Sequence, residues 1–237
     1  MSTLSYAGSA RPDPTILIID DHDLVATSLA MSLRSAGLRA QRHAVRSRAD
    51  VLVAAATLPP GIALLDLDLG REPDGTVIDG TALIERFRTT GWRVLVLTGT
   101  SDETRIGEAL AAGALAGIPK SAALPVLVTA VRRAMQGVEV MHPERRRKLI
   151  EAYLRRRDEA RAIDRRLGRL TDRERAVLNC LAQGRRAQSI ADEFNVSLAT
   201  VRTQIRAVLG KLEVGSQLEA VSLLHDHQRI VRRGRLD

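Results

Sequence analysis

The stretch "GIALLDLDLGREPDG" (residues 61–75) decides the fold class, because a short apolar run ends abruptly in two carboxylates, Asp66 and Asp68. Four consecutive apolar residues, bounded by a glycine and an acid, predict a strand that is buried on both faces, as strands of parallel sheets are. Open parallel sheets bind their ligands beyond the carboxyl ends of the strands. The stretch therefore predicts a parallel sheet with a polar site at one edge.

The same alternation continues on both sides of this strand. Further strands are expected at 15–20, 38–45, 93–98 and near 115–118. Helices are expected at 23–37, 48–58, 80–91, 102–113 and 123–137. Five strand–helix repeats predict an open five-stranded, doubly wound parallel sheet with helices on both faces.

Polar residues follow four of the expected strands. They are Asp20 and Asp21 after the first, Asp66 at the end of the third, Thr98 at the end of the fourth and Lys120 after the fifth. Any one of them alone is more often a helix cap or a solvated loop residue. Because the carboxyl ends of parallel strands share one edge, their joint placement favours a single site.

The quoted segments "LIIDDHD", "IALLDLDLG", "LVLTG" and "AGIPKS" resemble the receiver domain of bacterial two-component response regulators, over about residues 14–136. The resemblance implies a flavodoxin-like fold, phosphorylation of Asp66 by a sensor histidine kinase, and a bound Mg²⁺. Asp20, Asp21, Asp66 and the backbone carbonyl of Asp68 would hold the ion. Thr98 would donate to a phosphoryl oxygen, and Lys120 would pair with the carboxylate and then with the phosphate.

Elementary chemistry agrees with these roles. Convergent carboxylates repel one another and need a cation or partial protonation. Mg²⁺ prefers oxygen ligands and is commonly shared between one or two carboxylates and a phosphate. Lysine supplies a compact cation on a flexible stem, and a carboxylate is an established phosphoryl acceptor.

Three positions depart from the usual receiver pattern. Gly70 stands where proline is common. Gly80 follows Asp66 by 14 residues, where about eight are usual, so loop 70–80 is expected to be extended above the site. Gly117 replaces the usual aromatic residue three positions before the lysine, and no aromatic residue lies within 114–120. Signal transmission from the site is therefore expected to differ.

Positive charge gathers in the second half of the chain. Residues 136–237 carry 22 Lys and Arg against 14 Asp and Glu, whereas the chain as a whole has a net charge of +8. Such asymmetry favours a nucleic-acid partner, although a solvated basic face would give the same count.

A helical linker is expected at 138–168, opened by Pro143. Its apolar positions follow a heptad spacing through Leu149, Tyr153, Arg156, Ala160, Ile163, Leu167 and Leu170. Two alternatives remain open for this seam: a coiled coil that pairs two copies, or a connector helix that packs on one of the domains.

The segment 170–224 resembles the four-helix helix-turn-helix domain of the LuxR type. Thr171 and Glu174 predict a capping box, and Ser197 is expected to cap the third helix. The resemblance places one stripe of that helix in the major groove, namely Ala199, Arg202, Thr203 and Arg206. Phosphate contacts are expected from Thr200, Lys211, Arg185 and Arg186.

The domains are therefore expected to be a tail (1–13), a receiver domain (14–137), the linker (138–168) and an all-α LuxR-type domain (169–237). The sequence indicates a cytoplasmic, promoter-binding response regulator that acts as a homodimer, with no membrane role and no enzymatic activity of its own. A single cysteine, Cys180, fits a reducing compartment. The alternatives are a LuxR-type transcription factor that no longer uses phosphorylation and a small phosphatase with an aspartyl intermediate.

Overall fold

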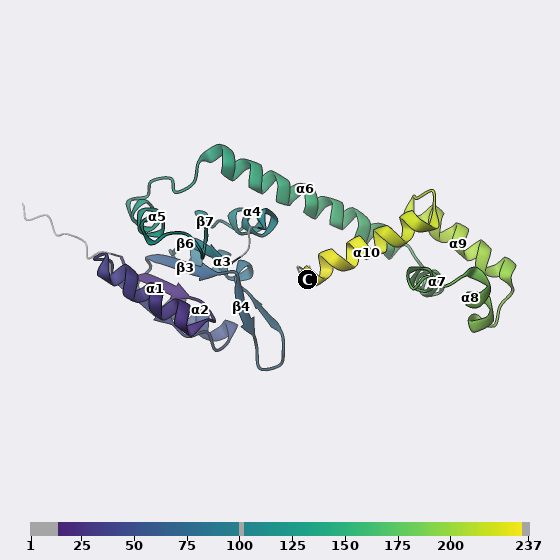
Figure 1. The fold of residues 1–237 in the computed structure, drawn as a ribbon, viewed down its shortest axis with the longest axis horizontal. Coiled ribbons are helices and arrows are strands. Elements are labelled where there is room, and N and C mark those ends of the chain that lie inside the picture. The colour runs from purple at the N-terminus through teal and green to yellow at the C-terminus, as the bar shows by residue number, and fades with distance from the viewer. Residues whose placement is uncertain (1–13, 100–101, 234–237) are drawn as a thin grey trace, which may run out of the picture. The chain divides into compact units, whose positions relative to one another are not determined.

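The computed structural model describes residues 14–99 and 102–233 of the chain (Figure 1). The tail expected at 1–13 lies outside the described residues. The chain divides into two compact units between Leu154 and Arg155. The expected domain boundaries at 138 and 169 stay predictions, because the division falls inside one long helix, α6 (Pro143–Gly168).

The first unit is built on five parallel strands in the order β2-β1-β3-β6-β7. The strands are β1 (Ile16–Ile19), β2 (Ala40–His43), β3 (Ile62–Asp66), β6 (Arg93–Thr98) and β7 (Ala116–Pro119). The helices are α1 (Asp23–Ser35), α2 (Arg48–Thr57), α3 (Thr81–Thr89), α4 (Glu103–Ala111) and α5 (Leu124–Gln136). The order confirms the expected doubly wound sheet. It also reverses between β1 and β3, which is where such sheets hold ligands.

Alternate residues of each strand enter two separate cores. Ile16 and Ile18 of β1 join the core that is closed by α1 and α5. Leu17 and Ile19 join the core that is closed by α2, α3 and α4. Because both faces are covered, the central strands are apolar along almost their whole length, and the carboxylates come only at their ends.

The segment after Asp66 is a hairpin, where the sequence predicted only an extended loop. Strands β4 (Asp68–Arg71) and β5 (Val77–Asp79) pair antiparallel, with Asp68 opposite Asp79. Leu69 and Ile78 are buried in the core beneath α2 and α3, so one face of the hairpin is anchored. Burial of each such side chain contributes about 1.5–3 kcal/mol, which is enough to order a short insertion.

The second unit is helical and comprises α7 (Asp172–Ala182), α8 (Ala187–Phe194), α9 (Leu198–Leu212) and α10 (Gln217–Arg233). The expected capping box at Thr171 and Glu174 is present, and Ser197 accepts a hydrogen bond from the Thr200 amide at the start of α9. Cys180 is buried, as expected for a small core residue.

The far end of α9 is closed by Glu213, whose backbone is left-handed with a φ of 58°. Its carboxylate forms ion pairs with Arg169 at 2.7 Å and with Arg166 at 3.4 Å. These arginines lower the pKa of Glu213, chiefly through the hydrogen bond from Arg169. Both ends of α9 are therefore fixed by side chains from within the unit.

The heptad seam of α6 is used inside the chain itself. Leu167 and Leu170 are buried in the core formed with α7, α9 and α10, and Ile163 packs against that core. Leu149 is buried in the first unit. These burials favour the connector helix over the coiled coil. Among the helices described here, none combines the length and the apolar character that a bilayer span requires.

Candidate functional site

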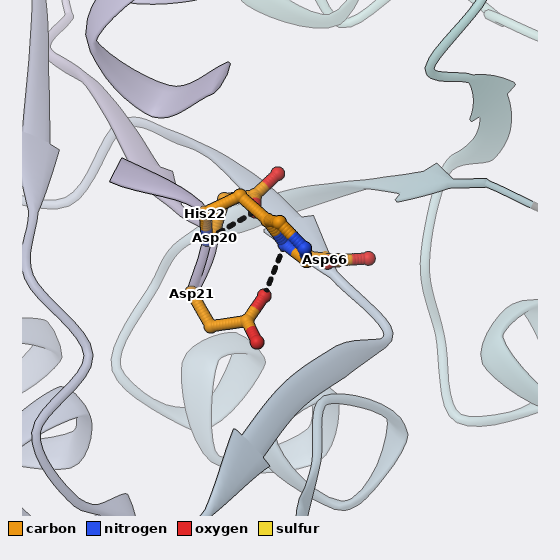
Figure 2. Close-up of side chains that lie close together, drawn as sticks. All are labelled: Asp20, Asp21, His22 and Asp66. Atoms are coloured by element: carbon orange, nitrogen blue, oxygen red, sulfur yellow. Dashed lines mark hydrogen bonds and ion pairs between the residues drawn. The ribbon is translucent and has the colours of Figure 1, made fainter. Parts of the chain in front are cut away.

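The carboxyl ends of β1 and β3 bring three carboxylates together. Asp20 and Asp21 follow β1, and Asp66 is the last residue of β3. Single ligand atoms of Asp20, Asp21, His22 and Asp66 all lie within 4.8 Å of one another, and Figure 2 shows these side chains meeting. Asp20 and Asp66 are 1% and 3% exposed, whereas Asp21 is open to water. The site therefore has a buried floor and one accessible edge.

Lys120 supplies the positive charge that balances this cluster. Its Nζ lies 2.7 Å from Asp66 Oδ2 and 2.6 Å from Asp20 Oδ2. The backbone of Lys120 is fixed to the neighbouring strand, because its N–H donates to the Thr98 carbonyl at 2.8 Å. Thr98 itself is buried at the end of β6. All four strand ends that were expected to contribute thus meet at one edge.

Burial raises the pKa of the Asp66 carboxyl, and the hydrogen bond from Lys120 partly offsets that rise. The backbone N–H of Asp68 also donates to this carboxylate and favours its ionised form. Conversely, the hydrogen bonds to Asp20 and Asp66 raise the pKa of Lys120 although burial alone would lower it. Lys120 therefore offsets part of the cost of ionising the buried Asp66, and the two carboxylates favour the charged form of Lys120.

The donor set fits a hard divalent cation. Three carboxylates with one open edge match the preference of Mg²⁺ for a few oxygen ligands plus waters. The hairpin passes beside this edge, since a Cβ on Gly70 would lie 3.2 Å from Asp21 Oδ2. Gly70 has a φ of +77°, which proline cannot adopt. The first departure from the receiver pattern is therefore a requirement of the hairpin.

Two residues near the site were missed by sequence reasoning. His22 Nδ1 lies 2.7 Å from Asp21 Oδ1, and this carboxylate is the main cause of the raised pKa of His22. Its position directly after the two aspartates was a usable signal. Arg105 of α4 contacts Asp68 and Asp79 at the base of the hairpin. No pattern in the sequence pointed to this contact, because 37 residues separate Arg105 from Asp68.

At position 117, where an aromatic residue is usual, Ile106 fills the space that a larger side chain would need. A Cβ on Gly117 would lie 2.9 Å from Ile106 Cγ2 and 3.6 Å from Val96 Cγ2. Ile106 belongs to α4, so this helix packs directly over β7 at that point. A large side chain at 117 therefore has no room unless Ile106 moves.

In the second unit, α9 carries the polar stripe expected from its sequence. Val201, Ile205, Val208 and Leu212 are buried. The side chains of the other stripe are exposed, and these are Ala199, Arg202, Thr203 and Arg206. Within the described part of the chain neither Arg202 nor Arg206 has an ion-pair partner, so both guanidinium groups are available to an anion.

The residues expected to contact phosphate differ in whether another side chain of the protein already binds them. Arg186 is exposed. Lys211 Nζ lies 2.6 Å from Glu174 Oε2, and Arg185 forms an ion pair with Glu193. Thr200 shares a hydrogen bond with the hydroxyl of Ser197. Only part of this set is thus free in the unbound protein, and the rest must exchange an internal partner for a phosphate.

Comparison with known families matches both units. The family described as "Response regulator receiver domain" matches residues 16–132, and "Bacterial regulatory proteins, luxR family" matches residues 169–224. The first match contains the acidic cluster with Thr98 and Lys120. The second contains α7, α8, α9 and the beginning of α10.

Relatives resemble the chain along nearly its whole length. The response regulator protein VraR of Staphylococcus aureus is 28% identical over 215 residues, which cover 91% of this chain and 98% of that protein. A solved structure of the RcsB response regulator of Salmonella typhimurium is 21% identical, covers 91% of this chain and 99% of the other, and has a TM-score of 0.49. Full-length FixJ from B. japonicum is 25% identical, with coverages of 94% and 98% and a TM-score of 0.45.

Proposed function

Because the chain belongs to the DNA-binding response regulators that carry a receiver domain and a LuxR-family domain, we propose that phosphorylation of Asp66 controls how it binds promoter DNA. The observation that carries this proposal is the convergence of Asp20, Asp21 and Asp66 within 4.8 Å, with Lys120 bridging two of them. In this arrangement a carboxylate oxygen lies close to the solvent-accessible side of the acidic cluster, where a cation can bind.

In the proposed reaction an Asp66 carboxylate oxygen attacks the phosphorus of a phosphohistidine on a sensor kinase. The new O–P bond forms as the P–N bond breaks, and the electron pair of that bond returns to the imidazole. Lys120 stays beside Asp66 and pairs with the added negative charge. The Thr98 hydroxyl donates to a phosphoryl oxygen.

Asp20, Asp21, Asp66 and the backbone carbonyl of Asp68 would hold the Mg²⁺. When bound, the ion screens the repulsion between the anionic donor and the carboxylates and neutralises charge on the transferring group. The hairpin beside Asp21 narrows the approach to this edge. It is therefore positioned to influence which kinase can reach Asp66.

On DNA, Arg202 and Arg206 would read base edges in the major groove together with Ala199 and Thr203. Arg186, Arg185, Lys211 and Thr200 would contact phosphates and fix the register. A homodimer on paired half-sites fits this type of domain. Because most apolar residues of the α6 seam, namely Leu149, Ala160, Leu167 and Leu170, are buried within the chain itself, we place the dimer contact elsewhere than on that seam. We place the protein in the cytoplasm, where the promoter and the kinase output are found.

The test is incorporation of a phosphoryl group from acetyl phosphate with Mg²⁺, followed by intact mass. The wild type should gain one group and Asp66→Asn none. Asp74→Asn, which changes an exposed aspartate at the hairpin tip, is the matched control and should behave as the wild type. Incorporation that persists in Asp66→Asn removes Asp66 from the acceptor role.

One observation favours a second candidate, namely a transcription factor that does not use phosphorylation. Ile106 occupies the space beside Gly117, so the usual aromatic coupling is absent. In that case DNA affinity would be the same with and without beryllium fluoride plus Mg²⁺. No geometric feature of the described residues favours the phosphatase alternative. A phosphatase would also have no use for a second unit that matches the LuxR family.

A further inference from the structure

The base of the inserted hairpin holds an unusual charge arrangement. Asp68 and Asp79 stand opposite each other in the antiparallel pair, and like charges in that position are destabilising. The guanidinium of Arg105 lies against both, with Nη1 2.5 Å from Asp68 Oδ1 and Nη2 3.4 Å from Asp79 Oδ1. Its side chain is only 25% exposed. Arg105 of α4 therefore holds the two strands of the hairpin together at their base.

The same guanidinium reaches the backbone next to the phosphoryl acceptor. Arg105 Nη2 donates to the Leu67 carbonyl at 2.9 Å. The following residue, Asp68, directs its N–H to the Asp66 carboxylate. A planar, five-donor guanidinium can hold a carbonyl and a carboxylate together in a way that an ammonium cannot. Arg105 thus fixes the orientation of the peptide that faces Asp66.

The opposite side of α4 contacts the linker helix. A Cβ on Gly107 would lie 2.3 Å from the Leu149 carbonyl oxygen and 2.9 Å from Tyr153 Cβ, so the backbones of α4 and α6 touch there. Arg146 of α6 donates to the carbonyls of Leu110, Ala114 and Leu115, which follow from the last turn of α4 into β7. Any movement of α4 must change these contacts.

We propose that Arg105 is a positioning residue for the Asp66 site and that, through α4, it carries the phosphorylation signal to the N-terminal part of α6. The hairpin and Arg105 take over the coupling that the chain lacks at Gly117. A phosphoryl group on Asp66 carries about −1.5 to −2 charges and replaces the single carboxylate charge two residues from Asp68. The guanidinium then redistributes its bonds among Asp68, Asp79 and the Leu67 carbonyl, and α4 shifts against α6. This inference rests on the proposed function.

The experiment uses the full chain and three variants. Arg105→Gln removes the charge and the fork, and Arg105→Lys restores the charge alone. Arg71→Gln is the matched control, because Arg71 lies exposed on the same hairpin and, among the residues that the structure describes, donates only to the nearby Gly75 carbonyl. Hydrogen exchange is followed in α4 and in residues 143–154, with and without beryllium fluoride and Mg²⁺. Phosphoryl incorporation from acetyl phosphate is measured in parallel by intact mass.

In the wild type and in Arg71→Gln, the phosphoryl mimic should change exchange in residues 143–154 by about fivefold or more, the size of ordinary coupling between sites. Arg105→Gln should accept a phosphoryl group at Asp66 more slowly than the wild type and, once saturated with the mimic, should lose this change. Arg105→Lys should incorporate at an intermediate rate and recover the change only in part. A merely structural role would alter exchange equally in both states and leave the mimic-dependent difference in place.

Asp79→Asn tests the same clamp from the hairpin side, and it decides the matter if Arg105→Gln does not fold. It keeps the oxygen that accepts from the Thr81 amide while it removes the charge that faces Arg105. A response of wild-type size in Arg105→Gln, or in Asp79→Asn where that variant decides, overturns the inference. Incorporation in the wild type without any change at 143–154 also overturns it and leaves the proposed function intact. Absence of incorporation in the wild type overturns both.

Discussion

The ammonium group of Lys120 contacts Oδ2 of Asp66 at 2.7 Å, although both side chains are largely removed from water. The same nitrogen serves Asp20 at 2.6 Å, so two buried carboxylates depend on one cation. Breaking a buried pair by removing one partner leaves an uncompensated charge, which is much more costly than losing an exposed pair. Lys120 is therefore a structural counter-ion before any phosphate arrives.

Lys120→Met should lower the free energy of unfolding of the first unit by about 3 kcal/mol, the lower end for a buried pair, since Lys120 is 22% exposed. Mg²⁺ should restore part of the loss. Urea unfolding followed by Trp92 fluorescence checks this, because Trp92 is the only tryptophan and is buried in this unit. Lys148→Met, at an exposed lysine of α6, is the control. Equal losses in the two variants would contradict the counter-ion role.

Gly117→Ala should destabilise the first unit by about 1–3 kcal/mol, the usual cost of overpacking. The added methyl group would lie 2.9 Å from Ile106 Cγ2. The double variant Gly117→Ala with Ile106→Ala should lose less than the sum of the two single changes, because the clash is gone. Trp92 fluorescence in urea again gives the free energies. Strict additivity would show that the two positions do not compete for space.

Glu174→Gln should make the free energy of unfolding of the second unit less dependent on pH in the acidic range. Hydrogen bonding by Lys211, and then by the Thr171 amide, lowers the pKa of Glu174 below its ordinary value of 4.5. A depressed folded pKa means that the group stabilises the fold above pH 4.5, and that this stabilisation is lost as the pH falls through the folded pKa. Helical circular dichroism during unfolding at several pH values measures the effect. Glu159→Gln, at an exposed glutamate of α6, should keep the wild-type slope.

Arg206→Ala should lose about 1–3 kcal/mol of discrimination between a selected DNA site and its single-base variants. Arg186→Ala should weaken all sequences alike and reduce the salt slope of binding by about one. The sites can be obtained by selection from random duplexes with the wild-type chain. Equal weakening on every sequence by both variants would contradict the assignment of Arg206 to base readout.

Most of the fold was predictable because local patterns agree with global packing. The apolar run ending at Asp66, the capping box at Thr171 and the amphipathic α9 each need only neighbouring residues to be interpreted. The hairpin was not predicted, although "DG" at 74–75 is a turn signal. Its strands are only four and three residues long, and its base pairs two aspartates. Arg105, which is distant in the sequence, offsets the repulsion within that pairing.

The candidate sites, like the fold, were predictable only in part. Asp20, Asp21, Asp66 and Lys120 were predictable as neighbours, because strand ends in a parallel sheet must share an edge. The internal partners of Lys211 and Arg185 were not predictable, since the glutamates that hold them lie on other turns and helices. Sequence spacing gives the face of a helix on which a charge stands. It does not give the acid that reaches it from a neighbouring element.

The left-handed Glu213 has a consequence for the thermodynamics of recognition. A non-glycine residue in this conformation costs on the order of 1 kcal/mol, and here two arginine pairs retain it. With Ser197 closing the other end, α9 is ordered before DNA is met. Docking then carries no entropy penalty for winding this helix. The heat-capacity change of complex formation should accordingly reflect contact surface alone, without the added contribution that coupled folding brings.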